Sequence, residues 1–227
     1  MPFSITRQEI ALRFSEIQSF LTLIKAQDRD AGLATEASRN TTKGLFFVLL
    51  YGALEFAITR TVSQAINTIN SRSIKSQHLS ECLYCLALDS DFTSIANTGR
   101  RGAWEKRVSL FAKQFSDTAA VLHETALMHD LQNVRSDTIR IVFNVFGIPD
   151  TPLYDVRVRQ YLEEIAERRN EVAHGRGSAA DVGRAYTSQA LENLLQQILR
   201  QVTHVVSSFE SHISSKLFVR ADFRSSY

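Results

Sequence analysis

An arginine, an asparagine and a histidine stand close together in the stretch "IAERRNEVAHGRG", from Ile165 to Gly177. A histidine that titrates near neutral pH can take the proton of a 2′-hydroxyl or give one to a leaving oxygen. An arginine nearby can hold a phosphate and stabilise the charge that develops on its oxygens in the transition state. Arg169, Asn170 and His174 therefore indicate cleavage of an RNA phosphodiester, by a route that needs neither a metal nor another cofactor.

The place of Arg169 on its helix makes this interpretation more specific than the spacing alone. At about 100° per residue, Arg169 falls near the centre of an apolar arc, four residues after Ile165. An unpaired guanidinium is costly in a dry core, so this part of the arc should open onto a cleft, an interface or an anion. Asn170 and His174 share one edge of the helix, and Gly175 lets the chain turn directly after the imidazole. The structural alternative is a helix-end histidine beside an arginine that extends to solvent.

Helices must position these residues, because helices are the only regular secondary structure that the sequence predicts. Apolar residues recur at helical spacing and no segment alternates convincingly at period two, so we expect an all-α helical bundle. The length of 227 residues and the absence of an internal repeat favour a single domain over residues 1–227. Helices are expected at about 5–26, 41–69, 78–88, 104–115, 136–146, 154–174 and 189–214. Residues 89–103 are expected to be an irregular connection, and residues 175–188 a polar turn.

The segment 41–69 is apolar nearly all round in its first half, which predicts a helix in the middle of the bundle. Its most hydrophobic run is interrupted by Glu55 and is shorter than the ~20 residues that span a bilayer, so no membrane contact is expected. The N-terminus is amphipathic and the two cysteines suggest no secreted disulfide framework, so a cytoplasmic protein is expected. The segment 136–146 should be capped by Ser136 or Asp137 and should end at Gly147.

Charge gives little help with the substrate. The net charge of +2 is too small to indicate nucleic-acid binding, and residues 155–184 contain six Arg and six acidic residues. Arg168 and Arg176 flank the motif and are candidates for guiding RNA, which would have to be held by geometry more than by field strength.

Four other groups of residues carry weaker signals. Cys82 and Cys85, with His78 upstream, could suggest zinc, but a fourth ligand is missing, so we expect core thiols and no metal. Arg72 and His78 repeat the arginine–histidine spacing, but in a polar segment without an apolar helix behind it.

The segment "GRRG" at 99–102 could contact phosphate and Trp104 could stack a base, although a solvated loop before a buried tryptophan is the preferred interpretation. Asp89 and Asp91 could bind a cation, but they also suit a helix-ending turn.

The octapeptide "RRNEVAHG" at Arg168–Gly175 resembles the signature of the HEPN superfamily, in particular its RiboL-PSP-type members and their relatives in prokaryotic defence and toxin–antitoxin systems. The likeness extends to "LFFVLLYGALEFAITRTV", which is similar to the buried helix of these families with its Tyr and Glu, and to "TIRIVFNVFGI" before the motif helix. These segments occur in the family's order between about Leu45 and His174.

The resemblance implies a HEPN-like bundle, here with additional N-terminal and inserted helices, that forms a homodimer with two Arg/His sets across a shared cleft. It implies a metal-independent endoribonuclease that leaves a 2′,3′-cyclic phosphate, with Arg169 and His174 as the catalytic pair and Asn170 as the supporting polar residue. An antitoxin or another defence protein is then an expected partner. Arg176 stands where HEPN toxins silenced by a nucleotidyltransferase carry tyrosine, so that particular pairing is not expected. The alternative is a non-catalytic HEPN scaffold that binds RNA or a protein.

Overall fold

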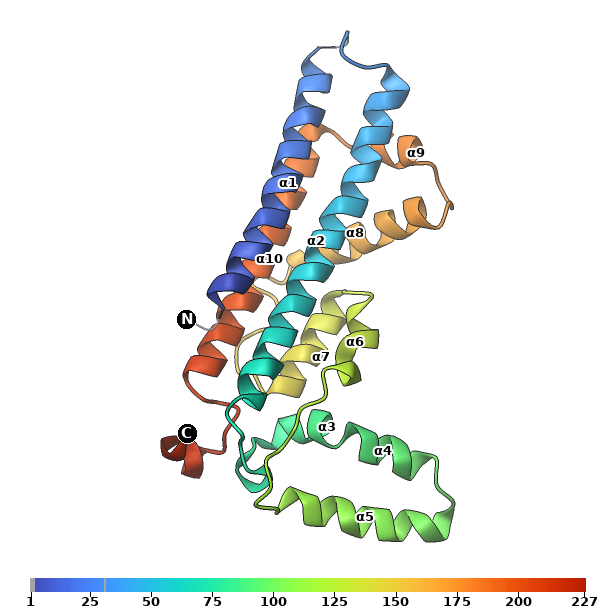
Figure 1. Ribbon diagram of the computed structural model, residues 1–227. Helices are drawn as coiled ribbons and strands as arrows, with labels where there is room; N and C mark the ends of the chain where they lie inside the picture. The colour runs from blue at the N-terminus through green and yellow to red at the C-terminus, as the bar shows by residue number, and fades with distance from the viewer. Residues whose placement is uncertain (1–2, 31) are drawn as a thin grey trace.

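Three long helices form the body of the molecule: α1 (Ser4–Arg29), α2 (Glu36–Asn70) and α10 (Ser188–Ser214) (Figure 1). The helix α2 packs against both of the others and also against α8 and α9, so it is the element around which the bundle is built. The shorter helices are η1 (Ser76–His78), η2 (Glu81–Leu83), α3 (Tyr84–Ala87), α4 (Asp89–Ala96), α5 (Arg100–Gln114), α6 (Thr125–Leu131), α7 (Ser136–Phe146), α8 (Val158–Ala173), α9 (Ala179–Arg184) and η3 (Ala221–Ser226).

The computed structural model describes residues 3–30 and 32–227, apart from the side chain of Met128. Within these ranges no β-strand is present, and two isolated bridges join Lys75 to Ala119 and Leu79 to Val219. The predicted all-α bundle is therefore confirmed.

The central position of α2 follows from its sequence. Phe46, Phe47, Leu50 and Leu54 are fully buried, as the all-round apolar pattern predicts. The helix begins before the predicted residue 41, because the Thr35 hydroxyl accepts a hydrogen bond from the Ser38 backbone N–H at 3.2 Å and caps it. By length and composition alone α2 could cross a membrane, but 56% of its most hydrophobic window is buried within the fold, as in the core helix of a globular protein.

The helix α9 lies in the segment that was predicted to be a polar turn, and it packs directly on the backbone of α2. A Cβ atom at Gly44 of α2 would lie 1.9 Å from the Ala179 carbonyl oxygen, and one at Gly183 of α9 would lie 1.9 Å from the Asn40 carbonyl oxygen. Two glycines that are far apart in sequence thus allow the two backbones to meet. The turn prediction was wrong because six residues carry too weak a periodic signal without this contact.

The predicted irregular connection 89–103 was also wrong, because it contains α4 and the start of α5. These helices form a hairpin at the end of the molecule opposite α9 (Figure 1). Asp89 and Asp91 lie in the first turn of α4 rather than in a helix-ending turn, and the Asp91 carboxylate pairs with Lys113 of α5 at 2.6 Å.

The helix α7 ends as predicted at Gly147, whose φ of 65° is left-handed. Its start differs from the prediction, because Ser136 is the first helical residue rather than the cap. The Ser136 hydroxyl instead donates to Glu163 of α8 at 2.8 Å, and Arg135 pairs with the same carboxylate at 2.6 Å. Burial alone would raise the pKa of Glu163, but the hydrogen bonds from Arg135 and Ser136 lower it overall. This contact fixes the start of α7 against the helix that carries the motif.

Candidate functional site

Arg169 lies on α8 with its side chain turned toward α2. Its guanidinium carbon stands 3.9 Å from the ring centroid of Tyr51, and its side chain is 20% exposed. One terminal nitrogen donates to Asn170 Oδ1 at 2.9 Å and the other to Glu55 Oε2 at 3.4 Å. The guanidinium is therefore neither sealed in the core nor extended into solvent, and it is held on three sides at the edge of the bundle.

Two residues of α2 set the electrostatics around this arginine. Tyr51 is 1% exposed, and burial raises the pKa of its hydroxyl although Arg169 acts in the opposite direction. That hydroxyl donates to Asn133 Oδ1 at 3.3 Å. Burial also raises the pKa of Glu55, and the charge of Arg169 offsets this only in part. The contact with Glu55 is long, at 3.4 Å, and the contacts with Asn170 and Glu55 use only two of the five N–H donors of the guanidinium, so donors remain for a second anion.

His174 is the residue at which α8 ends, and a well-defined turn holds it there. Gly175 has a φ of 66°, its N–H bonds the Val172 carbonyl at 3.3 Å, and the Arg176 N–H bonds the Glu171 carbonyl at 3.0 Å. This pair of bonds is the Schellman arrangement, which needs a left-handed residue after the cap. The imidazole itself is exposed, and no hydrogen bond joins it to another residue that the structure describes. It is free to meet a substrate.

The five predicted site residues divide into two groups. Arg169 and Asn170 touch through their side chains, and the His174 backbone N–H bonds the Asn170 carbonyl at 3.0 Å. In this structure the Asn170 side chain accepts a hydrogen bond from the guanidinium and so orients it. Whether these residues act in catalysis stays a prediction.

The two flanking arginines lie in different surroundings. Arg168 pairs with Glu171 at 2.7 Å and donates to the Tyr186 hydroxyl at 3.2 Å, which ties α8 to the segment after α9. Tyr186 in turn donates to Glu164 at 2.7 Å. Arg176 is exposed just beyond the histidine. Arg168 is therefore already engaged in an ion pair, whereas Arg176 is exposed and has no ion pair among the described residues.

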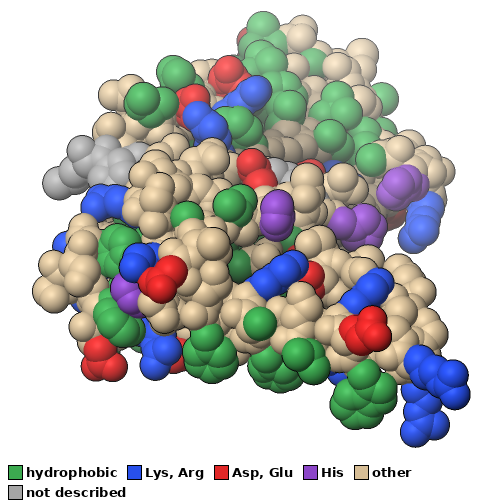
Figure 2. Space-filling view, turned by 60° about the horizontal axis from the view of Figure 1, so that its bottom comes forward, with side chains coloured by type: hydrophobic (Ala, Val, Ile, Leu, Met, Phe, Trp, Pro, Cys, Tyr) green, Lys and Arg blue, Asp and Glu red, His purple; other side chains and the backbone are tan. Residues whose placement is uncertain are grey.

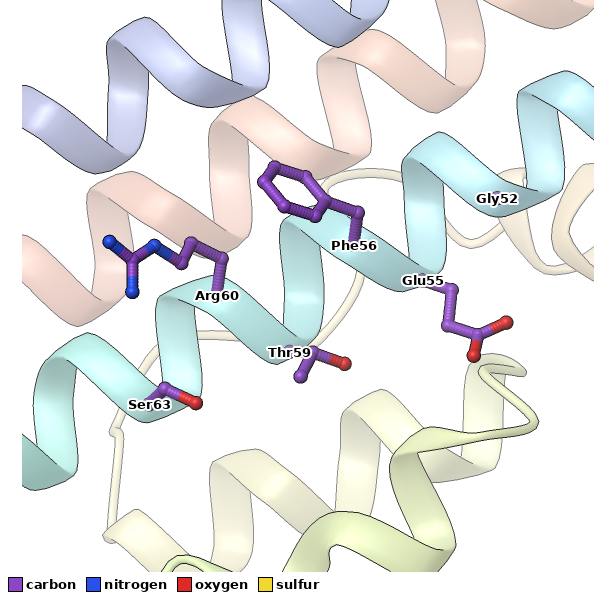
Figure 3. A pocket seen from close by; sticks show the side chains of 6 residues that line it. All are labelled: Gly52, Glu55, Phe56, Thr59, Arg60 and Ser63. Carbon is purple, nitrogen blue, oxygen red and sulfur yellow. The ribbon is translucent and has the colours of Figure 1, made fainter.

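A surface pocket of about 410 Å³ runs along α2 from Glu55 toward Ser63 (Figure 3). Glu55 and Thr59 point to one side of the helix and Phe56 and Arg60 to the other (Figure 3). Glu55 lines this pocket and also contacts Arg169, so the pocket and the guanidinium share this carboxylate.

The residues considered for a metal are not arranged to hold one. No group of three or more His, Cys, Asp or Glu side chains is placed to bind an ion in the part of the chain that the structure describes. Cys82 and Cys85 are exposed, so the prediction of core thiols was wrong. The turn η2 and the four-residue helix α3 direct Leu83 and Leu86 into the core instead.

The second arginine–histidine pair is used structurally. His78 stacks on Phe223 with ring centroids 3.8 Å apart, and its Nδ1 lies 3.0 Å from the Tyr227 hydroxyl. Arg72 is exposed near the Tyr227 carbonyl. The setting of Arg169 therefore distinguishes the two pairs, as the sequence suggested.

Tyr51, Glu55 and Asn133 were not identified as site residues from the sequence. The signal that was available is the polar interruption of an otherwise apolar helix at Glu55, together with a tyrosine one turn before it. Sequence alone could not pair them with Arg169, since the contact joins helices more than a hundred residues apart.

Comparison with protein families gives a result for almost the whole chain. The family model described as RiboL-PSP-HEPN matches residues 8–215, which include α2, α8 and the motif. No curated protein and no solved structure matches the chain. Since the matched region covers far more than half of the residues, the chain belongs to the RiboL-PSP-HEPN family.

Proposed function

We propose that this protein is a metal-independent endoribonuclease, in which Arg169 and His174 are the catalytic pair and Asn170 positions the arginine. The observation that carries the proposal is the oriented guanidinium, four-fifths buried over Tyr51, on the same helix as an imidazole that the chain turn leaves exposed. Membership of a family of HEPN ribonucleases supports the same activity.

The chemistry requires no group beyond these residues and the RNA. The His174 imidazole takes the proton of a 2′-hydroxyl, and that oxygen forms a bond to the adjacent phosphorus. The bond from phosphorus to the 5′-oxygen breaks, and an imidazolium returns a proton to the leaving oxygen. The products are a 2′,3′-cyclic phosphate and a 5′-hydroxyl, so no water is consumed. Arg169 binds the non-bridging oxygens and stabilises their growing charge.

A homodimer is part of the proposal, and the outer face of α2 supports it. Leu45 and Leu49 are 43% and 45% exposed, and they continue at helical spacing into Gly52 and Phe56. A second pocket of about 400 Å³, between α1 and α2, shares Gly52 and Phe56 with the first. A second subunit on this face would lie beside Glu55 and so bring two Arg169–His174 sets near each other. Light scattering on Leu49→Glu should then show a monomer where the unsubstituted protein shows a dimer.

The biological setting is proposed from the family. We place the protein in the cytoplasm as the toxin or effector of a prokaryotic defence or toxin–antitoxin system, with an antitoxin or another defence protein as its partner. Arg176 takes the place of the tyrosine used in one known mode of silencing, so a different form of restraint is proposed here.

A non-catalytic scaffold is the second candidate, and the Arg169–Glu55 ion pair is the observation that favours it. The two separate in one assay. Purified protein and the His174→Ala variant are incubated with total RNA in EDTA, and new 2′,3′-cyclic phosphate ends are measured. His123→Ala, which changes an exposed histidine in the linker before α6, is the matched control. Cleavage by the unsubstituted protein and the control, but not by His174→Ala, supports the nuclease, and intact RNA in every sample supports the scaffold.

A further inference from the structure

The outer face of α5 exposes a row of large apolar side chains, which we call the α5 stripe. Its members are Trp104, Val108, Phe111 and Phe115, which are 61%, 71%, 61% and 67% exposed. Exposed apolar residues are common singly, but a contiguous row of this size marks a surface that meets something. The prediction of a buried tryptophan after a solvated loop was therefore wrong, because the residues before it are the first turn of α5.

Nothing in the described part of the chain covers the α5 stripe. In the described part of the chain the helix packs mainly against α4 and η1, Tyr84 of α3 donates to the Gln114 carbonyl at 3.3 Å, and Ala103 and Leu110 are its buried residues. Two contacts join α5 to α4 on the inner side of the hairpin. The Lys113 ammonium pairs with the Asp91 carboxylate at 2.6 Å, and the Lys106 ammonium donates to the Ser94 hydroxyl at 2.7 Å. Figure 2 looks onto this end of the molecule and shows hydrophobic side chains along its lower edge, with Lys and Arg at one end of the row. These contacts thus hold the inner side of the hairpin, and the α5 stripe on the outer side stays exposed.

The spacing of the α5 stripe indicates that its partner is a helix. Positions 104, 108, 111 and 115 follow the alternating four- and three-residue steps of a helix–helix seam. Such a row fits along another helix that carries apolar residues at the same steps. Single-stranded RNA fits less well, because Val108 has no π face and the Arg107 guanidinium already lies 4.9 Å from the Trp104 ring centroid.

The positive charge of α5 indicates that the partner is acidic. The helix α5 contains five basic residues and one acidic residue, Glu105. At about 100° per residue, Arg100 and Arg107 flank one side of the stripe and Arg101 flanks the other. A second copy of α5 lying parallel to the first would bring like charges together beside Trp104 and Val108, and an antiparallel copy would offer these arginines no carboxylates. Glutamates or aspartates beside an apolar row would pair with them.

We propose that the α5 stripe is a docking site for an acidic amphipathic helix of another protein. The α5 stripe contacts the partner's apolar residues. Arg100, Arg101 and Arg107 bind the carboxylates on either side of those residues. This surface is formed by α4 and α5 and does not include the candidate nuclease site on α2 and α8. The proposal therefore stands whether or not the protein cleaves RNA.

The experiment uses the fact that Trp104 is the only tryptophan of the chain. Its emission reports burial of the stripe directly, in the full-length protein. The probe is a synthetic three-heptad peptide with Leu at the a and d positions and Glu at the e and g positions. Its glutamates repel one another, so it pairs with a basic partner in preference to itself. The matched peptide has Lys in place of each Glu.

The acidic peptide should shift the Trp104 emission to shorter wavelength and bind at least roughly tenfold more tightly than the Lys peptide, with an affinity that falls as salt is raised. The double variant Val108→Ser, Phe111→Ser should lose the shift while its helical circular dichroism stays unchanged. Ser109→Ala, on the same helix but outside the stripe, should behave like the unsubstituted protein. Arg101→Glu with Arg107→Glu should reverse the preference in favour of the Lys peptide.

Equal binding of both peptides, or no shift with either, would overturn the proposal. A shift with single-stranded oligonucleotide or with anionic phospholipid vesicles, in the absence of one with the acidic peptide, would overturn it in favour of RNA or of a membrane surface. RNA cleavage by the Val108→Ser, Phe111→Ser variant is measured in parallel, so a failure of the nuclease proposal is seen separately.

Discussion

Arg169 and Arg107 each lie over an aromatic ring, and we propose different roles for them. The Arg169 guanidinium is 3.9 Å from the ring centroid of Tyr51, and Arg107 is 4.9 Å from that of Trp104. Tyr51 is 1% exposed and Trp104 is 61% exposed. A cation over a ring gains about 0.5–1 kcal/mol at the surface and about 2 kcal/mol when it is desolvated.

The difference lies in what surrounds each pair. Asn170 and Glu55 hold Arg169 from two further sides, so its orientation is set before any ligand arrives. Arg107 is exposed and lies at the edge of an apolar row, where a mobile charge can adjust to a partner. An arginine over an aromatic ring thus suits the proposed transition-state binding at Tyr51 and the proposed docking at Trp104, because the first pair is buried and fixed in geometry whereas the second is exposed.

The largest expected effect compares the two arginines directly. Arg169→Ala should lower the rate of RNA cleavage by about 10²–10⁴-fold, since it removes the group that stabilises the transition-state charge. Arg107→Ala should leave that rate unchanged. The measurement is initial rates on one labelled RNA in EDTA, with thermal unfolding to show that both variants are folded. Equal losses in the two variants would contradict the assignment of separate roles.

The next effect tests what fixes the position of α8 and α9. Gly183→Ala would bring a Cβ into the Asn40 carbonyl, so α9 must move away from α2 at a cost of about 3 kcal/mol or more. The melting temperature should fall by roughly 5–10 °C. Gly52→Ala is the control, because nothing lies within 4 Å of its added Cβ and it should be neutral or stabilising. A normal melting temperature for Gly183→Ala would mean that the close backbone contact is absent in solution.

The free energy of unfolding should depend on pH through His212, which lies on α10. Both ring nitrogens are buried without a hydrogen-bond partner among the described residues, and burial, with a smaller effect of Arg224, lowers the pKa of this imidazole to about 4 from 6.5. Below pH 6.5 the unfolded chain binds a proton that the folded chain does not. The free energy of unfolding should therefore fall as pH drops from about 6.5 to about 4, by on the order of 2 kcal/mol.

Urea unfolding of the unsubstituted protein and of His212→Leu at several pH values measures this contribution. The leucine variant should lack the part of the slope that lies between about pH 6.5 and 4, while the part due to carboxylates such as Glu163 stays. Identical slopes in the two proteins would show that this imidazole titrates in the folded state as it does in the unfolded one.

The smallest effect concerns the carboxylate that shares Arg169 with the substrate. Glu55→Gln removes the competing negative charge 3.4 Å from the guanidinium, so the KM for RNA should decrease by about two- to fivefold. The turnover rate should change less than the KM does, since Tyr51 and Asn170 still orient the arginine. A purely structural ion pair would instead show a loss of stability with an unchanged KM.

Secondary structure was predictable from sequence where the apolar period was long. The motif helix ends at Ala173, against a predicted 174, and α10 covers Ser188–Ser214, against a predicted 189–214. The segment 78–88, predicted as one helix, is divided among η1, η2 and α3, and the motif helix begins at Val158 rather than at 154. The segments 89–103 and 175–188, predicted to be irregular, contain the short helices α4 and α9. Packing stabilises these against α5 and against the backbone of α2, and neither contact leaves a local periodic signal.

The sequence by itself determined the helical class, the central place of α2, the turn after His174 and the interruption of an apolar arc by Arg169. These depend on near-neighbour spacing and on a single left-handed glycine. Only the tertiary structure decided that Arg169 meets Tyr51 and Glu55, that Arg168 donates to Tyr186, and that Trp104 faces outward. Those outcomes depend on which helix covers which face, and that choice is made by contacts between residues far apart in the chain.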